Sequence, residues 1–158
     1  LFIYQNNNIR PTFNILINRS TSMATKSLDN VSRWDILKKT IYNRLIQCGL
    51  QSDDKINVLF NPPLNSLPKE VSLNQIDKVI NEENVVELPP SDMPLFQMTK
   101  MKGQYFYVTD SIAEIPNSLK NKVTVVYIKD EAHINVGWIE FWEEALSGFA
   151  ATLQICFK

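Results

Sequence analysis

Polar side chains that carry oxygen atoms stand at the ends of two apolar segments. Asn18 ends the run 13–18, Ser20 and Ser22 follow it at alternate positions, and Asp130 follows the run 123–128. Ligands of an open α/β sheet bind beyond the carboxyl ends of its strands, so we expect these side chains to lie together. Mg²⁺ prefers about six oxygen ligands of this kind. A Mg²⁺ site is therefore chemically possible here, but the Asn18 amide carries no charge and its carbonyl is a weaker ligand than a carboxylate.

Groups suited to covalent or acid–base catalysis are scarce in this chain. Ser20, His133 and Asp130 could be imagined as a hydrolytic triad, but the sequence contains one His and four Gly. A glycine-lined nucleophile elbow is absent from it. We therefore expect no enzymatic activity, and a small α/β hydrolase is the least favoured alternative.

Two tryptophans mark a possible contact surface. Trp138 and Trp142 lie four positions apart, on one face of a helix predicted over 138–146. Such a pair can pack in the core, or it can bind a partner, because Trp is enriched at interaction hot spots. Both interpretations stay open from the sequence.

Composition excludes several classes of function. The 16 basic and 17 acidic residues give a net charge of -1, so no basic excess is available to bind nucleic-acid phosphates. No apolar run approaches the roughly 20 residues that span a bilayer, so no membrane partner is expected. Cys48 and Cys156 are interpreted as buried free thiols of a reducing compartment. We therefore expect an intracellular protein, either nuclear or cytoplasmic.

Asparagine is the one residue type in clear excess. The chain contains sixteen, and most are expected in loops. Asn18 and Asn30 also begin N-glycosylation sequons. We expect no glycan at a buried strand end, whereas a glycan on Asn30 would indicate a secreted protein.

The remaining pattern predicts alternating strands and helices. Ser32 and Asp35 form a capping-box pattern that begins a helix ending near Gln47, and Ser72 with Gln75 repeats the pattern. Further helices are expected at 72–81, 92–103 and 138–146, and further strands at 56–60, 85–88, 105–108, 123–128 and 152–157. We expect a Pro-rich loop at 62–70 and a short or broken element at 111–120.

The best predicted strands are continuous apolar runs, which is typical of strands buried on both faces of a parallel sheet. Their alternation with helices predicts an α/β fold, a three-layer sandwich with a mostly parallel central sheet flanked by helices. We expect a single domain over residues 1–158, with 1–11 as an N-terminal extension. Because residue 1 is Leu, we expect this chain to be a fragment of a longer one.

These features resemble the von Willebrand factor A (vWA) family, Rossmann-like α/β domains with a metal-ion-dependent adhesion site. The site begins with D-x-S-x-S after the first strand, and Asn18, Ser20 and Ser22 align with this motif. Asn18 replaces the Asp, so the resemblance implies a degenerate site that binds Mg²⁺ weakly or is empty. Thr109 is our suggestion for the metal-binding Thr of the family, and Asp130 matches its later acidic residue. The resemblance spans about residues 12–158 and is poor over 62–110.

The resemblance implies a non-enzymatic protein-interaction or scaffolding domain in a multisubunit intracellular complex. Its partners would be other protein subunits, bound through the loops at the strand ends or through exposed helices. It implies no cofactor other than possible weak Mg²⁺. The alternative is an adhesion-type domain that binds an acidic ligand residue through Mg²⁺.

Overall fold

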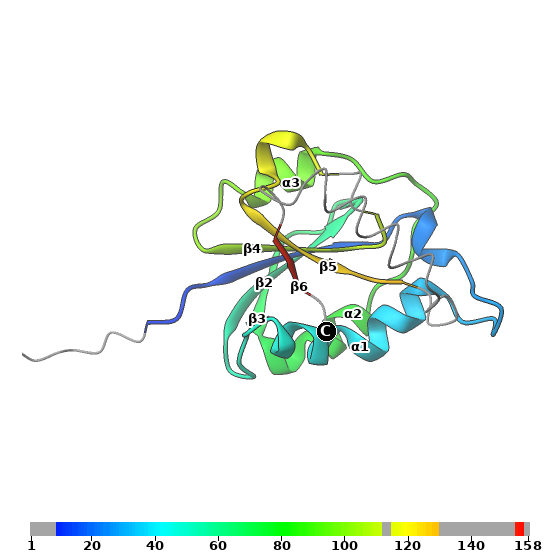
Figure 1. Cartoon of the computed structure of the whole chain (residues 1–158), viewed down its shortest axis with the longest axis horizontal. Coiled ribbons are helices and arrows are strands. Elements are labelled where there is room, and N and C mark those ends of the chain that lie inside the picture. The colour runs from blue at the N-terminus through cyan, green and yellow to red at the C-terminus, as the bar shows by residue number, and fades with distance from the viewer. Residues whose placement is uncertain (1–8, 112–114, 130–153, 157–158) are drawn as a thin grey trace, which may run out of the picture.

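A computed structural model describes residues 9–111, 115–129 and 154–156 of the chain (Figure 1). Its centre is a mixed sheet in the order β3-β2-β1-β4-β5-β6. All neighbouring strands are parallel except β3, which runs antiparallel to β2. The strands are β1 Phe13–Asn18, β2 Lys55–Asn61, β3 Lys69–Ser72, β4 Gln104–Thr109, β5 Val123–Tyr127 and β6 Gln154–Cys156. The predicted α/β fold with a mostly parallel sheet is confirmed.

The longest helix begins where the sequence predicts. Helix α1 spans Arg33–Gln47, and the Asp35 N–H donates to Ser32 Oγ at 3.0 Å while the Ser32 N–H donates to Asp35 Oδ2 at 3.3 Å. This reciprocal capping box satisfies two N–H groups at the start of the helix. The shorter helices are α2 Ile76–Asn81 and α3 Met93–Met98, with 3-10 turns η1 Thr21–Ala24, η2 Leu73–Gln75 and η3 Asn117–Leu119.

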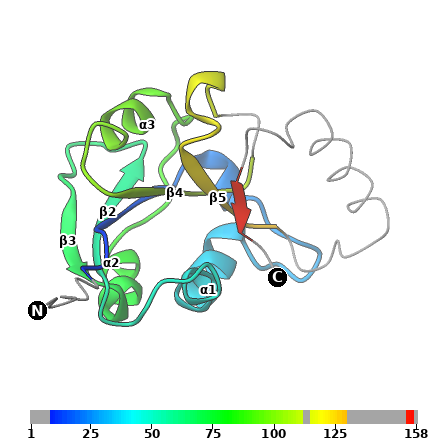
Figure 2. The ribbon, with the colours of Figure 1, turned by 60° about the vertical axis from the view of Figure 1, so that its left-hand side comes forward.

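The two faces of the sheet contribute to separate apolar clusters. On β1, Phe13, Ile15 and Ile17 pack with residues of α1 and α2, whereas Leu16 packs with residues of α3. This alternation follows from the two-residue period of a strand. Figures 1 and 2 show α1 and α2 on one side of the sheet and α3 on the other. Burial on both sides explains the continuous apolar runs.

Several expected elements differ from the structure. The loop was expected to extend to residue 70 and a helix to begin at Ser72, but Lys69–Ser72 forms β3 because it pairs with β2. Segment 85–88 is not a strand: the N–H of Val86 donates to the carbonyl of Arg19, and the N–H of Thr21 donates to the carbonyl of Leu88. The segment therefore binds the loop after β1 instead of a sheet edge. The helix expected to end at Gly103 stops at Met98.

The second expected capping box is wrong. Ser72 ends β3 and precedes η2, and its side chain makes no capping hydrogen bond. The expected helix over 138–146 lies outside the described residues, and β6 accounts for 154–156 of the strand expected over 152–157.

The expectation of free thiols is also wrong. Cys48, the C-cap residue of α1, is disulfide-bonded, and the described part of the chain contains no free cysteine. The sequence contains one other cysteine, Cys156 in β6. Because disulfides persist in oxidising compartments, this bond removes one of the reasons for expecting a reducing one.

Among the described residues, no helix has the length and apolar character needed to cross a bilayer.

Candidate functional site

The candidate site lies at the carboxyl ends of β1 and β4. These strands are parallel neighbours with Ile17 paired to Val108, so Asn18 and Thr109 end them side by side. Asn18, Ser20 and Thr109 are fully buried. The structure thus brings three of the sequence-predicted positions together at the sheet edge where α/β proteins bind ligands.

The orientation of the Asn18 amide is fixed by its neighbours. Asn18 Oδ1 accepts the backbone N–H of Ser20 at 2.8 Å. Its Nδ2 therefore points the other way, toward Thr109 Oγ1 at 3.1 Å and Asp110 Oδ1 at 3.2 Å. Because an amide nitrogen is only a donor, Asn18 presents hydrogens at the place where a carboxylate would present oxygens.

The two serines of the motif close the same cluster. Ser20 Oγ and Ser22 Oγ lie 3.1 Å apart, and Ser22 Oγ donates to Asp110 Oδ1 at 3.0 Å. Both hydroxyls therefore belong to a hydrogen-bond network that converges on one carboxylate.

Asp110 is the acidic residue of this site, and sequence reasoning missed it. It directly follows β4, just as the expected ligand Asp130 follows the run 123–128. The same signal, a carboxylate at the end of an apolar strand, could have found it. Asp130 itself lies outside the described residues.

Arg33 neutralises Asp110. Its Nη1 lies 2.7 Å from Asp110 Oδ2, and the side chain of Asp110 is only 2% exposed. Arg33 is the first residue of α1, so the capping box at Ser32 and Asp35 holds its backbone in place. The hydroxyl of Ser32 also lowers the pKa of the Asp35 carboxyl, because it donates to the ionised form.

The described donor set does not fit Mg²⁺. Asp110 is its only carboxylate, and both of its oxygens already accept hydrogen bonds, from Asn18, Ser22 and Arg33. The described residues contain no group of three or more His, Cys, Asp or Glu side chains that could hold a metal ion. The guanidinium of Arg33 thus occupies the carboxylate of Asp110, which a divalent cation would need as a ligand.

Arg19, between the motif residues, fixes the loop behind the site. It is buried, and its guanidinium pairs with Glu83 at 2.6 Å and donates to the carbonyls of Pro62 and Pro63, each at 2.7 Å. It also lies over the ring of Phe60, 5.0 Å from its centre. This rigid packing positions the backbone that carries Ser20 and Ser22.

The other predicted positions cannot be compared with the structure. Trp138, Trp142 and His133 lie outside the described residues.

Neither a protein-family model nor a curated protein matches the sequence. The functional argument therefore depends on the geometry of the site.

Proposed function

We propose that this chain is a non-enzymatic protein-interaction domain with vWA-type architecture, in which an ion pair takes the place of a metal ion. The observation that carries this proposal is the carboxylate of Asp110, whose hydrogen-bonding partners Asn18, Ser22 and Arg33 belong to the chain itself. A carboxylate held in this way supports structure in the loops. It offers no open ligand position for an acidic residue of a partner.

The topology supports the vWA-type part of the proposal. The order β3-β2-β1-β4-β5-β6, the antiparallel β3 and the apolar clusters on two faces fit a three-layer sandwich. The motif of Asn18, Ser20 and Ser22 lies beside the end of β4, where such a domain would build its site.

Burial of the one candidate nucleophile supports a binding role over hydrolysis. Ser20 has no exposed surface, and its hydroxyl is hydrogen-bonded to that of Ser22. A nucleophile needs a base within hydrogen-bond reach and access to substrate. Ser20 lacks that access, which favours the interaction domain over the α/β hydrolase.

The proposed partners are other protein subunits. The disulfide at Cys48 favours an oxidising compartment over the nuclear or cytoplasmic location expected from the sequence. Comparing the electrophoretic mobility of the native protein with and without reductant, after alkylation of free thiols, tests this point directly.

The experiment for the proposed function is co-purification from the native source, with mass spectrometry of the recovered proteins. One half of the sample is kept in EDTA and the other in Mg²⁺. We expect the same partners in both halves, because the interaction needs no cation. Partners that are recovered only with Mg²⁺, and are lost with Asp110→Asn, would contradict the proposal.

A secreted adhesion-type domain is the second candidate, and two observations favour it. Cys48 is disulfide-bonded, and the sequon residue Asn30 is exposed on a turn where its N–H donates to the carbonyl of Ser27. A glycan that is removed by a glycosidase and absent from Asn30→Asp would support secretion. Metal-dependent partner binding is the further requirement that separates this candidate from the first.

A further inference from the structure

The outer edge of β3 offers free backbone groups. In the described part of the chain, no strand pairs with this edge. The N–H of Leu73 donates to the carbonyl of Asp54 at 2.9 Å, which makes these two residues a hydrogen-bonded pair of the β2–β3 ladder. Because such pairs alternate along an antiparallel ladder, Val71 faces β2, whereas Glu70 directs its N–H and C=O groups and Ser72 its N–H group outward. Ser72 is also the N-cap of η2, so its carbonyl belongs to that turn.

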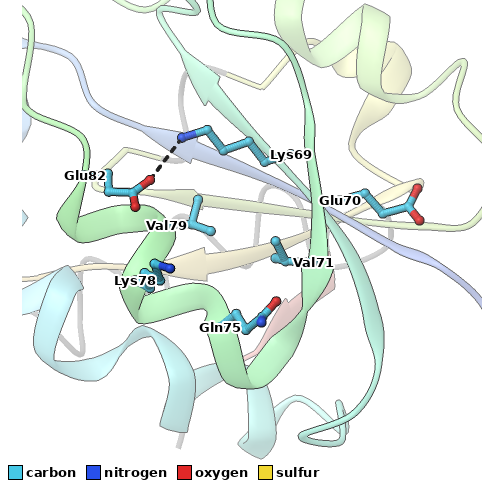
Figure 3. A pocket seen from close by; sticks show the side chains of 7 residues that line it. All are labelled: Lys69, Glu70, Val71, Gln75, Lys78, Val79 and Glu82. Carbon is cyan, nitrogen blue, oxygen red and sulfur yellow. Dashed lines mark ion pairs between the residues drawn. The ribbon is translucent and has the colours of Figure 1, made fainter.

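An open groove of about 400 Å³ runs between β3 and α2 (Figure 3). Figure 3 shows Lys69 and Val71 extending from β3 toward α2, while the side chain of Glu70, which also lines the groove, points away from α2. Val71, which is partly buried, supplies apolar surface in the groove, and Val79, only 5% exposed, lies beneath it at the floor. The edge of the strand and an apolar floor therefore lie next to each other.

The two lysines of the groove have different surroundings. Lys69 Nζ lies 3.3 Å from a carboxylate oxygen of Glu83 and 3.7 Å from one of Glu82. Lys78, on α2, is exposed, and no acidic side chain of the described residues lies within ion-pair distance of it. Lys78 therefore leaves one positive charge available at the rim.

We infer that this groove binds an extended segment of a partner protein, which adds as a strand to the outer edge of β3. The backbone of the segment pairs with Glu70 and Ser72, which is the β-augmentation mode of peptide recognition. An apolar side chain of the segment contacts Val71 and Val79, and an acidic side chain on the same face pairs with Lys78. Side chains on one face of a strand alternate with a period of two, so the two determinants lie two positions apart. This inference rests on the proposed interaction function and gives it a surface and a ligand class.

Ser72→Pro tests the strand addition with little change to the domain itself. Ser72 has φ −82° and ψ 152°, which proline adopts. Its N–H points outward, so proline removes a donor for the ligand and leaves the β2–β3 ladder intact. Ser72→Ala is the matched control because it changes the same side chain and keeps the N–H. Lys78→Glu is the second variant, and its surface position leaves folding unaffected.

The probe is a peptide selected from a phage-displayed library of random linear peptides on the whole domain, then synthesised and measured by fluorescence anisotropy. We expect an apolar and an acidic residue two positions apart. Ser72→Pro should weaken binding about tenfold, as loss of a backbone hydrogen bond and its geometry implies, and Ser72→Ala should leave it unchanged. Lys78→Glu should weaken the same peptide and select peptides with a basic residue instead.

The inference is overturned if no peptide is selected, or if Ser72→Pro and Lys78→Glu bind the selected peptide like the wild type. If Ser72→Pro fails to fold, Lys78→Glu alone decides. If the wild type forms a dimer and Ser72→Pro dissociates it, then a second copy of this chain occupies the groove. That result would also overturn the inference that the groove binds a segment of a partner protein. The co-purification in EDTA is a separate measurement. If partners are recovered there but no peptide binds the groove, then the inference about the groove fails while the proposed function stands.

Discussion

Arg33→Met removes the charge that neutralises Asp110 and keeps an unbranched side chain at the start of α1. The carboxylate of Asp110 is 2% exposed and the side chain of Arg33 is 23% exposed. Removing one partner of a fully buried ion pair costs about 3–5 kcal/mol. Since Arg33 is partly solvated and Asp110 keeps its bonds from Asn18 and Ser22, we expect the free energy of unfolding to fall by about 2–3 kcal/mol.

The loss is large enough to measure by thermal and urea unfolding, followed by circular dichroism. In a domain of this size, about 1 kcal/mol shifts the midpoint by about 2–4 °C, so the expected decrease is about 5–10 °C. Lys38→Met is the control, because it removes a cation of the same helix whose partner Asp35 is at the surface. That exposed pair should contribute less than about 0.5 kcal/mol.

A double-mutant cycle with Asp110→Asn isolates the pair. The double variant should be more stable than the sum of the two single changes implies, because replacing Asp110 removes the unpaired charge. If Arg33→Met costs no more than Lys38→Met, or if the two changes are additive, then the ion pair does not hold the loops together and our interpretation of the site is wrong.

Three further predictions concern the start of α1, the residue before β2 and the C-cap of α1. Ser32→Ala should lower the free energy of unfolding by about 1 kcal/mol in urea titrations, because the N–H of Asp35 loses its capping acceptor. Ser32→Thr keeps a hydroxyl at this position and should therefore lose less. The hydrogen bond from Arg10 lowers the pKa of Asp54 in the folded state, so its stabilisation is present above about pH 4 and is lost as the pH falls through the folded pKa. The difference between wild type and Arg10→Ala should therefore shrink in acid, and a constant difference would contradict this. Reductant should lower the unfolding midpoint through the Cys48 disulfide, and Cys48→Ser should remove this sensitivity.

The elements that sequence predicts best here are those with local determinants. The helix from Arg33 has its own capping box and the apolar strands have their own runs, so their positions follow from neighbours in sequence. Strand β3 carries no such signal, because Lys69 and Glu70 are polar and the strand exists only through pairing with β2. Whether a strand forms at this edge of the sheet therefore depends on pairing between segments that are distant in the sequence.

The buried asparagines also show that contacts between distant segments cannot be predicted from local sequence. Most asparagines were expected in loops, but Asn14 and Asn57 lie in two segments that were predicted as strands. They face each other across β1 and β2, where Asn57 Nδ2 donates to Asn14 Oδ1 at 3.0 Å. Asn61 ends β2 and donates to the carbonyl of Ser91 at 2.9 Å. A buried amide is tolerated when its hydrogen bonds are made, and those partners come from distant parts of the chain.

In the candidate site, the motif serines and Asn18 could be predicted from spacing. Arg33 could not, because nothing in the pattern around a helix start shows that its guanidinium reaches a carboxylate at the end of β4. Neither residue of the observed ion pair, Arg33 or Asp110, belonged to the expected metal site.

The central claim is that Arg33 occupies the role of a cation at Asp110, and a Mg²⁺ titration of the unfolding midpoint tests it most directly. A site with a dissociation constant of about 1 mM would stabilise the domain by about 1.4 kcal/mol at about 10 mM Mg²⁺. We expect no rise for the wild type, and a rise for Asn18→Asp with Arg33→Ala, which supplies a second carboxylate and removes the guanidinium. A rise in the wild type that Ser20→Ala abolishes would contradict the account.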